Sequence, residues 1–180
     1  TRPRLLLLDE PLSALDARIR QDLREQIRSI QQDLGLTTIF VTHDQEEALT
    51  MSDRIFLMNA GKIVQSGDAE TLYTAPVDAF AAGFIGNYNL LDAETASRLL
   101  LRPVSSRIAI RPEAIQLHHS GAIAAEILGH SLLGNVIRYR VEANGVQLLV
   151  DVLNRREGDL IGKGQCIGLT IDEQAIREVA

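Results

Sequence analysis

The 180-residue sequence has little cysteine and no hydrophobic run of membrane-spanning length. Its single cysteine, Cys166, excludes an internal disulfide framework and fits a reducing compartment, and we interpret it as a small buried apolar residue of a strand. The longest clear apolar run, Leu5 to Leu8, falls far short of the roughly 20 residues that a transmembrane helix needs. We therefore expect any contact with a membrane to be made through a partner protein.

An excess of basic residues is also missing. The formal net charge is -6 and the isoelectric point is near 5.2. Sequence-independent nucleic-acid binding needs clustered Lys and Arg, so this acidic balance argues against it. Hydrophobic residues make up 46% and charged residues 23% of the chain, which is the composition of an ordinary globular protein. The length allows one large domain or two small ones.

The first half of the chain predicts an α/β fold with a parallel sheet. Leu5 to Leu8 and Thr38 to Val41 are continuously apolar or β-branched, which is typical of strands buried on both faces of such a sheet. Between them we expect a helix with Asp16 as its N-cap and Gly35 at its end. A strand, a crossover helix and a second strand in this order form a βαβ unit. The apolar residues of the helix recur at helical spacing: Ile19, Leu23, Ile27, Ile30 and Leu34.

Two local signals follow the second strand. Asp44, with Glu47 three positions later, predicts the start of a short helix that runs to about Met51. Asn59 to Gly61 lies between two apolar runs and predicts the turn of a hairpin.

From about residue 88 the helical period gives way to the alternation of strands with one buried face. Asn144-Gly145, between two alternating runs, predicts a tight hairpin. Several short strands in this stretch predict a small barrel of the OB type. We therefore expect one domain over residues 1–87 and a second over residues 88–180.

Polar residues at the strand ends carry the candidate chemistry. Asp9 and Glu10 directly follow a buried strand, and His43 follows the next one, so all three should line the same edge of a parallel sheet. An Asp at this edge can hold Mg²⁺ through water, and a second carboxylate can take a proton from an attacking water. An imidazole there can hydrogen-bond a phosphate oxygen or orient the water. The alternative is a turn with two solvated acids and a histidine that serves only the structure.

Three ordered motifs resemble those of ABC ATPases. Leu5 to Glu10 resembles the Walker B strand, Pro11 to Asp16 is similar to the D-loop, and Thr42 to Asp44 resembles the H-loop with its switch histidine. The resemblance implies part of a P-loop NTPase (RecA-like) parallel sheet with helices, and a site for ATP and Mg²⁺.

The same resemblance assigns roles to five residues. It implies that Asp9 helps to hold Mg²⁺, that Glu10 is the general base for the lytic water, and that His43 senses the γ-phosphate. Ser13 and Asp16 are implied to face the second subunit across the nucleotide. Asp16 can serve as a helix cap at the same time.

The second half resembles the OB-like TOBE domain of one importer branch, which serves sugars, polyamines, iron(III), sulfate, molybdate and phosphonates. Ile110 to Glu113, followed by alternating strands, carries this resemblance, and Gly61 to Gly67 and Tyr73 to Pro76 support it. It implies an ATP-hydrolysing subunit that couples hydrolysis to solute uptake. The implied partners are a second ATPase subunit in a homodimer, membrane permease subunits and, indirectly, a solute-binding protein. The implied location is the cytoplasmic face of the cell membrane.

The phosphate-cradling Gly-x-x-x-x-Gly-Lys-Ser/Thr loop and the Leu-Ser-Gly-Gly-Gln signature occur nowhere in the sequence. With its abrupt start, this predicts a C-terminal fragment that does not hydrolyse ATP by itself. Resemblance favours iron(III), phosphonate or polyamine as the solute. A regulatory, dimerisation or anion-binding module is the alternative function, in which Arg111 either contacts an anion or forms a structural ion pair with Glu113. An ABC ATPase without a transport role is a further alternative, which the OB-like tail disfavours.

Overall fold

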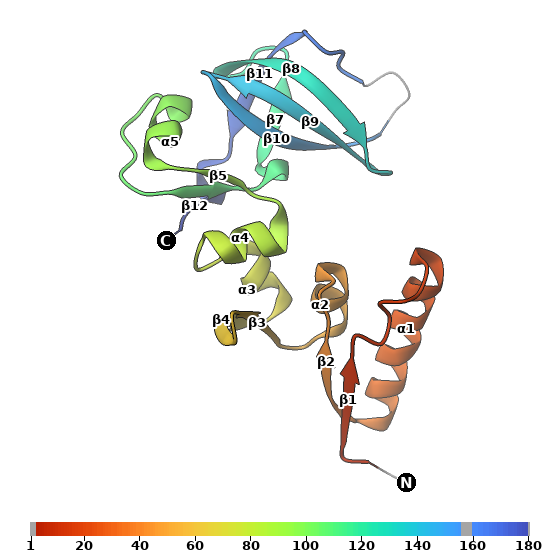
Figure 1. The fold of residues 1–180 in the computed structure, drawn as a ribbon. Coiled ribbons are helices and arrows are strands. Elements are labelled where there is room, and N and C mark those ends of the chain that lie inside the picture. The colour runs from red at the N-terminus through yellow and green to blue at the C-terminus, as the bar shows by residue number, and fades with distance from the viewer. Residues whose placement is uncertain (1–2, 156–159, 180) are drawn as a thin grey trace. The chain divides into compact units, whose positions relative to one another are not determined.

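The computed structural model describes residues 3–155 and 160–179 and begins with the strand–helix–strand unit that the apolar pattern predicts (Figure 1). Strands β1 (Leu5–Asp9) and β2 (Thr37–Val41) pair in parallel, and α1 (Ala17–Leu34) connects them. The Asp16 carboxylate accepts hydrogen bonds from two backbone N–H groups of the first turn of α1. Gly35 ends the helix in the left-handed conformation, with φ of 58°. Both predicted helix ends are confirmed.

The prediction that β1 and β2 are buried on both faces is wrong. Their side chains alternate between half-buried and exposed along both strands. Within the described residues this sheet has two strands, so it lacks the neighbouring strands and the second helical layer that bury a larger parallel sheet. One face is left apolar and open to solvent: Leu5, Leu7, Ile39 and Val41.

A short helix and a hairpin follow β2. Helix α2 (Gln45–Met51) starts at Asp44, whose carboxylate accepts from the N–H groups of the first turn, as predicted. Strands β3 (Ile55–Asn59) and β4 (Lys62–Gly67) form the predicted antiparallel hairpin. Helix α3 (Ala69–Thr74) comes next.

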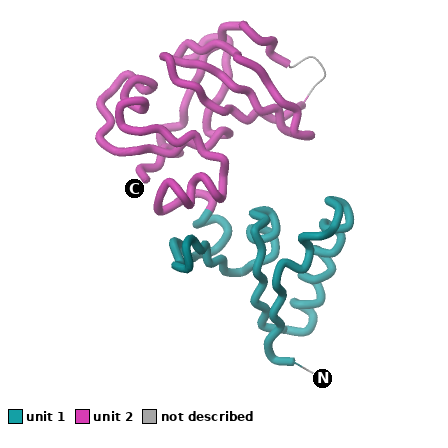
Figure 2. The backbone as a smooth tube through the Cα atoms, in the orientation of Figure 1, with its two compact units in different colours: residues 1–72 teal, residues 73–180 magenta. Residues whose placement is uncertain are grey.

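The chain divides into two compact units, residues 1–72 and 73–180 (Figure 2). The domain boundary that the sequence predicts between residues 87 and 88 rests on pattern and resemblance, and it stays a prediction. Of the helices in the described part of the chain, none combines the length and the apolar character that crossing a bilayer requires.

The described residues of the second unit form two antiparallel sheets, with the helices α4 and α5. The three-stranded sheet has the order β12-β6-β5, and the five-stranded sheet has the order β10-β9-β8-β11-β7. The elements of this unit are α4 (Ala79–Gly86), β5 (Asn89–Leu91), α5 (Ala93–Leu100), β6 (Ile108–Ile110), the 3₁₀ turn η1 (Pro112–Ala114), β7 (Ile115–His118), β8 (Ile123–Leu132), β9 (Val136–Ala143), β10 (Val146–Leu153), β11 (Cys166–Ile171), the 3₁₀ turn η2 (Glu173–Ala175) and β12 (Ile176–Glu178).

Alternating burial along these strands builds one apolar core. Every second residue of β9 is buried, as are Val146, Leu148 and Val150 of β10. The strands turn at Asn144-Gly145 with φ of 51° and 72°. Both values are positive, as a two-residue type I′ turn requires, so the predicted hairpin is confirmed. Tyr139 is the largest fully buried side chain. The OB-like character is confirmed, although the ladders among the described residues do not join β10 to β7 into a closed barrel.

Cys166 differs from its prediction. It lies in a strand, as expected, but it is exposed rather than buried. It is the first residue of β11 and pairs with Glu126 of β8, and both side chains are exposed. The alternation of the strand places the next residue, the half-buried Ile167, toward the core instead of Cys166.

Candidate functional site

The parallel pairing of β1 and β2 brings the candidate residues to one edge of the sheet. Asp9, the last residue of β1, is in register with Val41, the last residue of β2. The backbone N–H of Glu10 donates to the carbonyl of Val41 at 2.8 Å, so the pairing continues one residue beyond the strand. His43 follows two positions after Val41. The carboxyl ends of both strands therefore place their polar residues side by side.

Glu10 and His43 are in direct contact. The Nδ1 atom of His43 lies 3.3 Å from Oε1 of Glu10, and the two side chains are 70% and 48% exposed. Glu10 has a φ of 43°, a left-handed conformation that a residue other than glycine adopts only where the surroundings hold it. The sequence carries no signal of this backbone conformation. An exposed carboxylate with an imidazole partner is open to a ligand and can accept a proton from water.

The loop after β1 is held close to Glu10 by Ser13. The Ser13 hydroxyl donates to the Glu10 carbonyl at 3.0 Å, and the Ser13 N–H donates to the same oxygen at 3.3 Å. Leu12, only 2% exposed, anchors this loop in the interior. The Asp16 carboxylate caps α1, so Asp16 has a structural role in addition to any role at a subunit interface.

The sequence indicated Glu47 only as part of the start signal of α2 and did not indicate that its carboxylate is buried. Glu47 is 2% exposed, and its Oε2 accepts a hydrogen bond of 2.5 Å from the hydroxyl of Thr42. The same hydroxyl accepts from the N–H of Asp44 at 3.0 Å. The residues on both sides of His43 are thus fixed by hydrogen bonds, although His43 itself is exposed. Burial of a carboxylate is not visible in the sequence pattern, so this contact could not be predicted.

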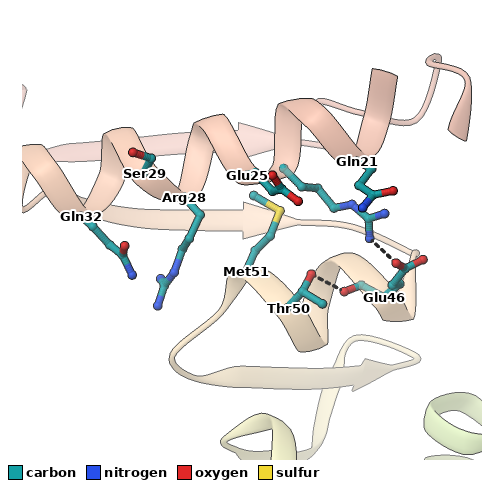
Figure 3. Close-up of a pocket in the computed structure, with 9 residues that line it drawn as sticks. Gln21, Glu25, Arg28, Ser29, Gln32, Glu46, Thr50 and Met51 are labelled. Carbon is teal, nitrogen blue, oxygen red and sulfur yellow. Dashed lines mark hydrogen bonds and ion pairs between the residues drawn. The ribbon is translucent and has the colours of Figure 1, made fainter. Parts of the chain in front are cut away.

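A separate pocket of about 360 Å³ lies between α1 and α2, and neither Glu10 nor His43 lines it (Figure 3). Arg24, which is 9% exposed, lines it and pairs with Glu46 at 3.1 Å between nitrogen and oxygen. Met51 adds an apolar wall from α2. Two arginines and two acids line the pocket, and both arginines form ion pairs, so the lining gives no preference for a ligand of one charge.

In the second unit, Arg111 and Glu113 form the predicted ion pair at 3.7 Å. The Arg111 guanidinium also lies 5.6 Å from the centroid of the Tyr73 ring, and the Tyr73 hydroxyl donates to Glu113 at 2.8 Å. Burial, followed by this hydrogen bond, raises the pKa of Tyr73 to about 12. These contacts favour the structural role of Arg111 over an anion contact.

The donor chemistry of the sheet edge fits Mg²⁺. The cation takes oxygen ligands and usually keeps several waters, so one exposed carboxylate such as that of Asp9 suits it better than a closed cage. Across residues 3–155 and 160–179, no group of three or more His, Cys, Asp and Glu side chains is arranged to hold a metal by itself. In the described part of the second unit, His118, His119 and His130 belong to no such group.

Comparison with known proteins connects both units to one family. The family model of the TOBE domain matches residues 108–177. The spermidine/putrescine import ATP-binding protein PotA of Rubrobacter xylanophilus is 36% identical over 95% of this chain and 52% of its own length. The Fe(3+) ions import ATP-binding protein FbpC 1 of Rhizobium meliloti is 41% identical over 83% of this chain and 48% of its own length.

A third relative, the spermidine/putrescine import ATP-binding protein PotA of Haemophilus ducreyi, is 35% identical over 96% of this chain and 55% of its own length. The chain therefore spans about half the length of the curated relatives that it matches. The similarity to the two PotA proteins covers almost all of the chain and so extends over both compact units. The chain is thus similar over most of its length to ABC importer ATP-binding subunits, and the TOBE domain that it matches lies in its second compact unit.

Proposed function

We propose that this chain supplies the catalytic sheet edge and the regulatory domain of an ATP-hydrolysing subunit that drives solute import. The observation that carries the proposal is the contact of 3.3 Å between Glu10 and His43 at the carboxyl ends of two parallel strands. Such edges are where open α/β sheets bind their ligands. The relatives are named import ATP-binding proteins, which supports the same function.

Each residue of the edge has a role that its chemistry suits. Glu10 is the general base, because its exposed carboxylate can accept the proton of a water that attacks a terminal phosphate. Its contact with Nδ1 of His43 keeps Nε2 of the same ring available for a phosphate oxygen. Asp9 holds Mg²⁺, and the ion when bound supplies charge neutralisation.

We further propose that two copies of the subunit meet across the nucleotides, with Ser13 and Asp16 facing the partner copy. Both residues lie in the exposed loop that follows Glu10. The assembled subunits act at the inner face of the membrane on permease subunits, to which a solute-binding protein delivers its cargo. Polyamine and iron(III) both occur among the names of the relatives at similar identity, so the solute stays a choice among polyamine, iron(III) and phosphonate.

Residues 1–180 alone are proposed to bind Mg-ATP weakly and not to hydrolyse it. Phosphoryl transfer depends on a loop that holds the phosphates, and no such motif occurs within this sequence. Titration calorimetry of the 180-residue chain with Mg-ATP tests this proposal. Micromolar affinity would contradict it. The regulatory or anion-binding role of residues 88–180 remains a separate prediction, tested by thermal shift with molybdate, sulfate, phosphate and phosphonates.

The role of Glu10 is tested in a longer subunit that joins this chain to a phosphate-binding loop. Glu10→Gln should lower the turnover number by about 10²-fold or more, the contribution typical of a general base, and leave ATP binding intact. Glu25→Gln, which alters an exposed acid of α1 away from the sheet edge, is the matched control and should leave turnover unchanged. Full turnover in the Glu10→Gln variant would remove Glu10 from its role.

A further inference from the structure

Three arginines of α1 stand four residues apart and share one face of the helix. Each forms an ion pair with an acid that follows β2, so the face joins α1 to the next segment of the chain. The pairs and their nitrogen–oxygen distances are Arg20 with Asp44 at 3.1 Å, Arg24 with Glu46 at 3.1 Å and Arg28 with Asp53 at 2.5 Å.

Arg20 differs from the other two in what it connects. One terminal nitrogen donates to the Asp44 carboxylate at 3.1 Å, and the other donates to the backbone carbonyl of Leu15 at 2.9 Å. Its Nε lies 4.0 Å from the buried carboxylate of Glu47. Leu15 belongs to the loop that follows Glu10, and Asp44 directly follows His43. A single side chain, 28% exposed, therefore bridges the two loops that carry the candidate catalytic pair.

The side chain of His43 is 70% exposed, so burial does not fix its position. Its neighbours are held instead. Thr42 donates to Glu47, and Asp44 accepts from Arg20 while it caps α2. The location of the imidazole is thus set through its backbone. Arg20 adds a side-chain link between this backbone and the loop beginning at Glu10, beyond the backbone hydrogen bond that joins Glu10 to Val41.

We propose that Arg20 is a positioning residue for ATP hydrolysis, which keeps the imidazole of His43 within hydrogen-bond reach of the Glu10 carboxylate. The proposal rests on the proposed function for its effect on turnover, but its geometric part does not. Arginine suits the role because its planar guanidinium presents donors in two directions at once. A lysine places one compact charge and cannot reach a carboxylate and a carbonyl with the same fixed geometry.

The geometric part is tested in the isotope-labelled 180-residue chain by nuclear Overhauser contacts between the His43 ring and the Glu10 side chain. We expect Arg20→Met to abolish these contacts and Arg20→Lys to weaken them. Arg28→Met is the matched control, because it also removes one ion pair between α1 and the following segment but touches neither loop. It should leave the contacts unchanged. Arg20→Lys keeps the charge beside Asp44 and provides a test even if Arg20→Met does not fold.

The functional part is tested in the longer subunit with a phosphate-binding loop. Misplacing a catalytic group by about 1 Å costs up to roughly 10²-fold in rate. Arg20→Met should accordingly lower kcat by about 10- to 100-fold with KM for ATP changed less than about twofold, while Arg28→Met keeps kcat. Arg20→Lys should recover part of the loss.

Two results would overturn the proposal. The first is retention of the His43–Glu10 contacts in Arg20→Met, and the second is an equal loss of kcat in Arg20→Met and Arg28→Met, which would indicate stability alone. Full turnover in Glu10→Gln would instead contradict the proposed function. In that case the contacts in the labelled chain still decide whether Arg20 positions His43.

Discussion

Replacing Asn89 with leucine should destabilise the second unit strongly, because this side chain acts as a substitute for a missing strand. Asn89 is 7% exposed. Its Nδ2 donates to the carbonyl of Leu149 at 2.9 Å and to that of Ile110 at 3.3 Å, and its Oδ1 accepts from the N–H of Leu149 at 2.7 Å. The amide therefore satisfies both backbone groups of Leu149 on β10 and links the three-stranded sheet to the five-stranded one.

The magnitude follows from the groups that the leucine would leave without partners. A buried polar group that loses its partner costs about 1 to 3 kcal/mol, and one N–H and two carbonyls are affected here. Leucine has the same branching of its heavy atoms and regains part of this by apolar burial. We expect a net loss of about 2 to 4 kcal/mol in the free energy of unfolding, toward the upper part of the range for single substitutions.

Urea denaturation followed by tyrosine fluorescence reports on the unfolding of the second compact unit. All three tyrosines, Tyr73, Tyr88 and Tyr139, lie in residues 73–180, and the chain has no tryptophan. With an m-value of about 1.5 kcal/mol/M, the midpoint for Asn89→Leu should fall by roughly 1.3 to 2.7 M.

Asn154→Leu is the matched control for this substitution. Asn154 is exposed, and the hydrogen bond that its Nδ2 donates to a carbonyl is 3.4 Å long. Its midpoint should move by less than about 0.3 M. A midpoint for Asn89→Leu that stays equally close to the wild type would refute the reasoning that the Asn89 amide replaces a strand.

Two further predictions concern the same unit. A Cβ added at Gly168 would lie 1.8 Å from the backbone nitrogen of Gly121, so Gly168→Ala should lower the free energy of unfolding in urea by roughly 3 kcal/mol or more. Gly162→Ala is the control and should cost little, because a Cβ there meets only a side chain, at 3.8 Å. Equal urea midpoints for the two variants would contradict this prediction. The pKa of Tyr73 is raised to about 12, so the stability that this shift contributes is complete below pH 10, the ordinary tyrosine value, and is lost as the pH rises toward 12. Ultraviolet titration should show this late tyrosine step, and Glu113→Gln should move it to lower pH; an unmoved step would exclude the hydrogen bond as a cause.

Much of the fold could be predicted because its signals are local. The cap at Asp16, the left-handed end at Gly35 and the turn at Asn144-Gly145 each depend on hydrogen bonds or φ angles within a few residues. Residue type alone therefore determines them. The nearness of Glu10 and His43 was also predictable, since parallel strands joined by one helix must end at the same edge.

Other features could not be predicted because they depend on what surrounds an element. The apolar residues of β1 and β2 indicate strands, but their burial requires neighbouring strands and helices on both faces, and that cover is a property of the assembled sheet. The exposure of Cys166 follows from the strand alternation of β11, in which Cys166 faces outward as its first residue. In neither case does the residue type decide how much solvent it meets.

By itself, then, the sequence determined the two ends of α1, the start of α2, two hairpin turns and which strand ends carry the polar residues. It did not predict α5, which lies in the stretch where only strands were expected. Only the tertiary structure decided which distant groups meet them: Arg20 with Asp44 across 24 positions, and Asn89 with Leu149 across 60. The physical reason is the distance along the chain between the groups that interact. Caps and turns close within one or two turns of backbone, whereas a buried side-chain contact exists only after the intervening chain has folded and brought its two partners together.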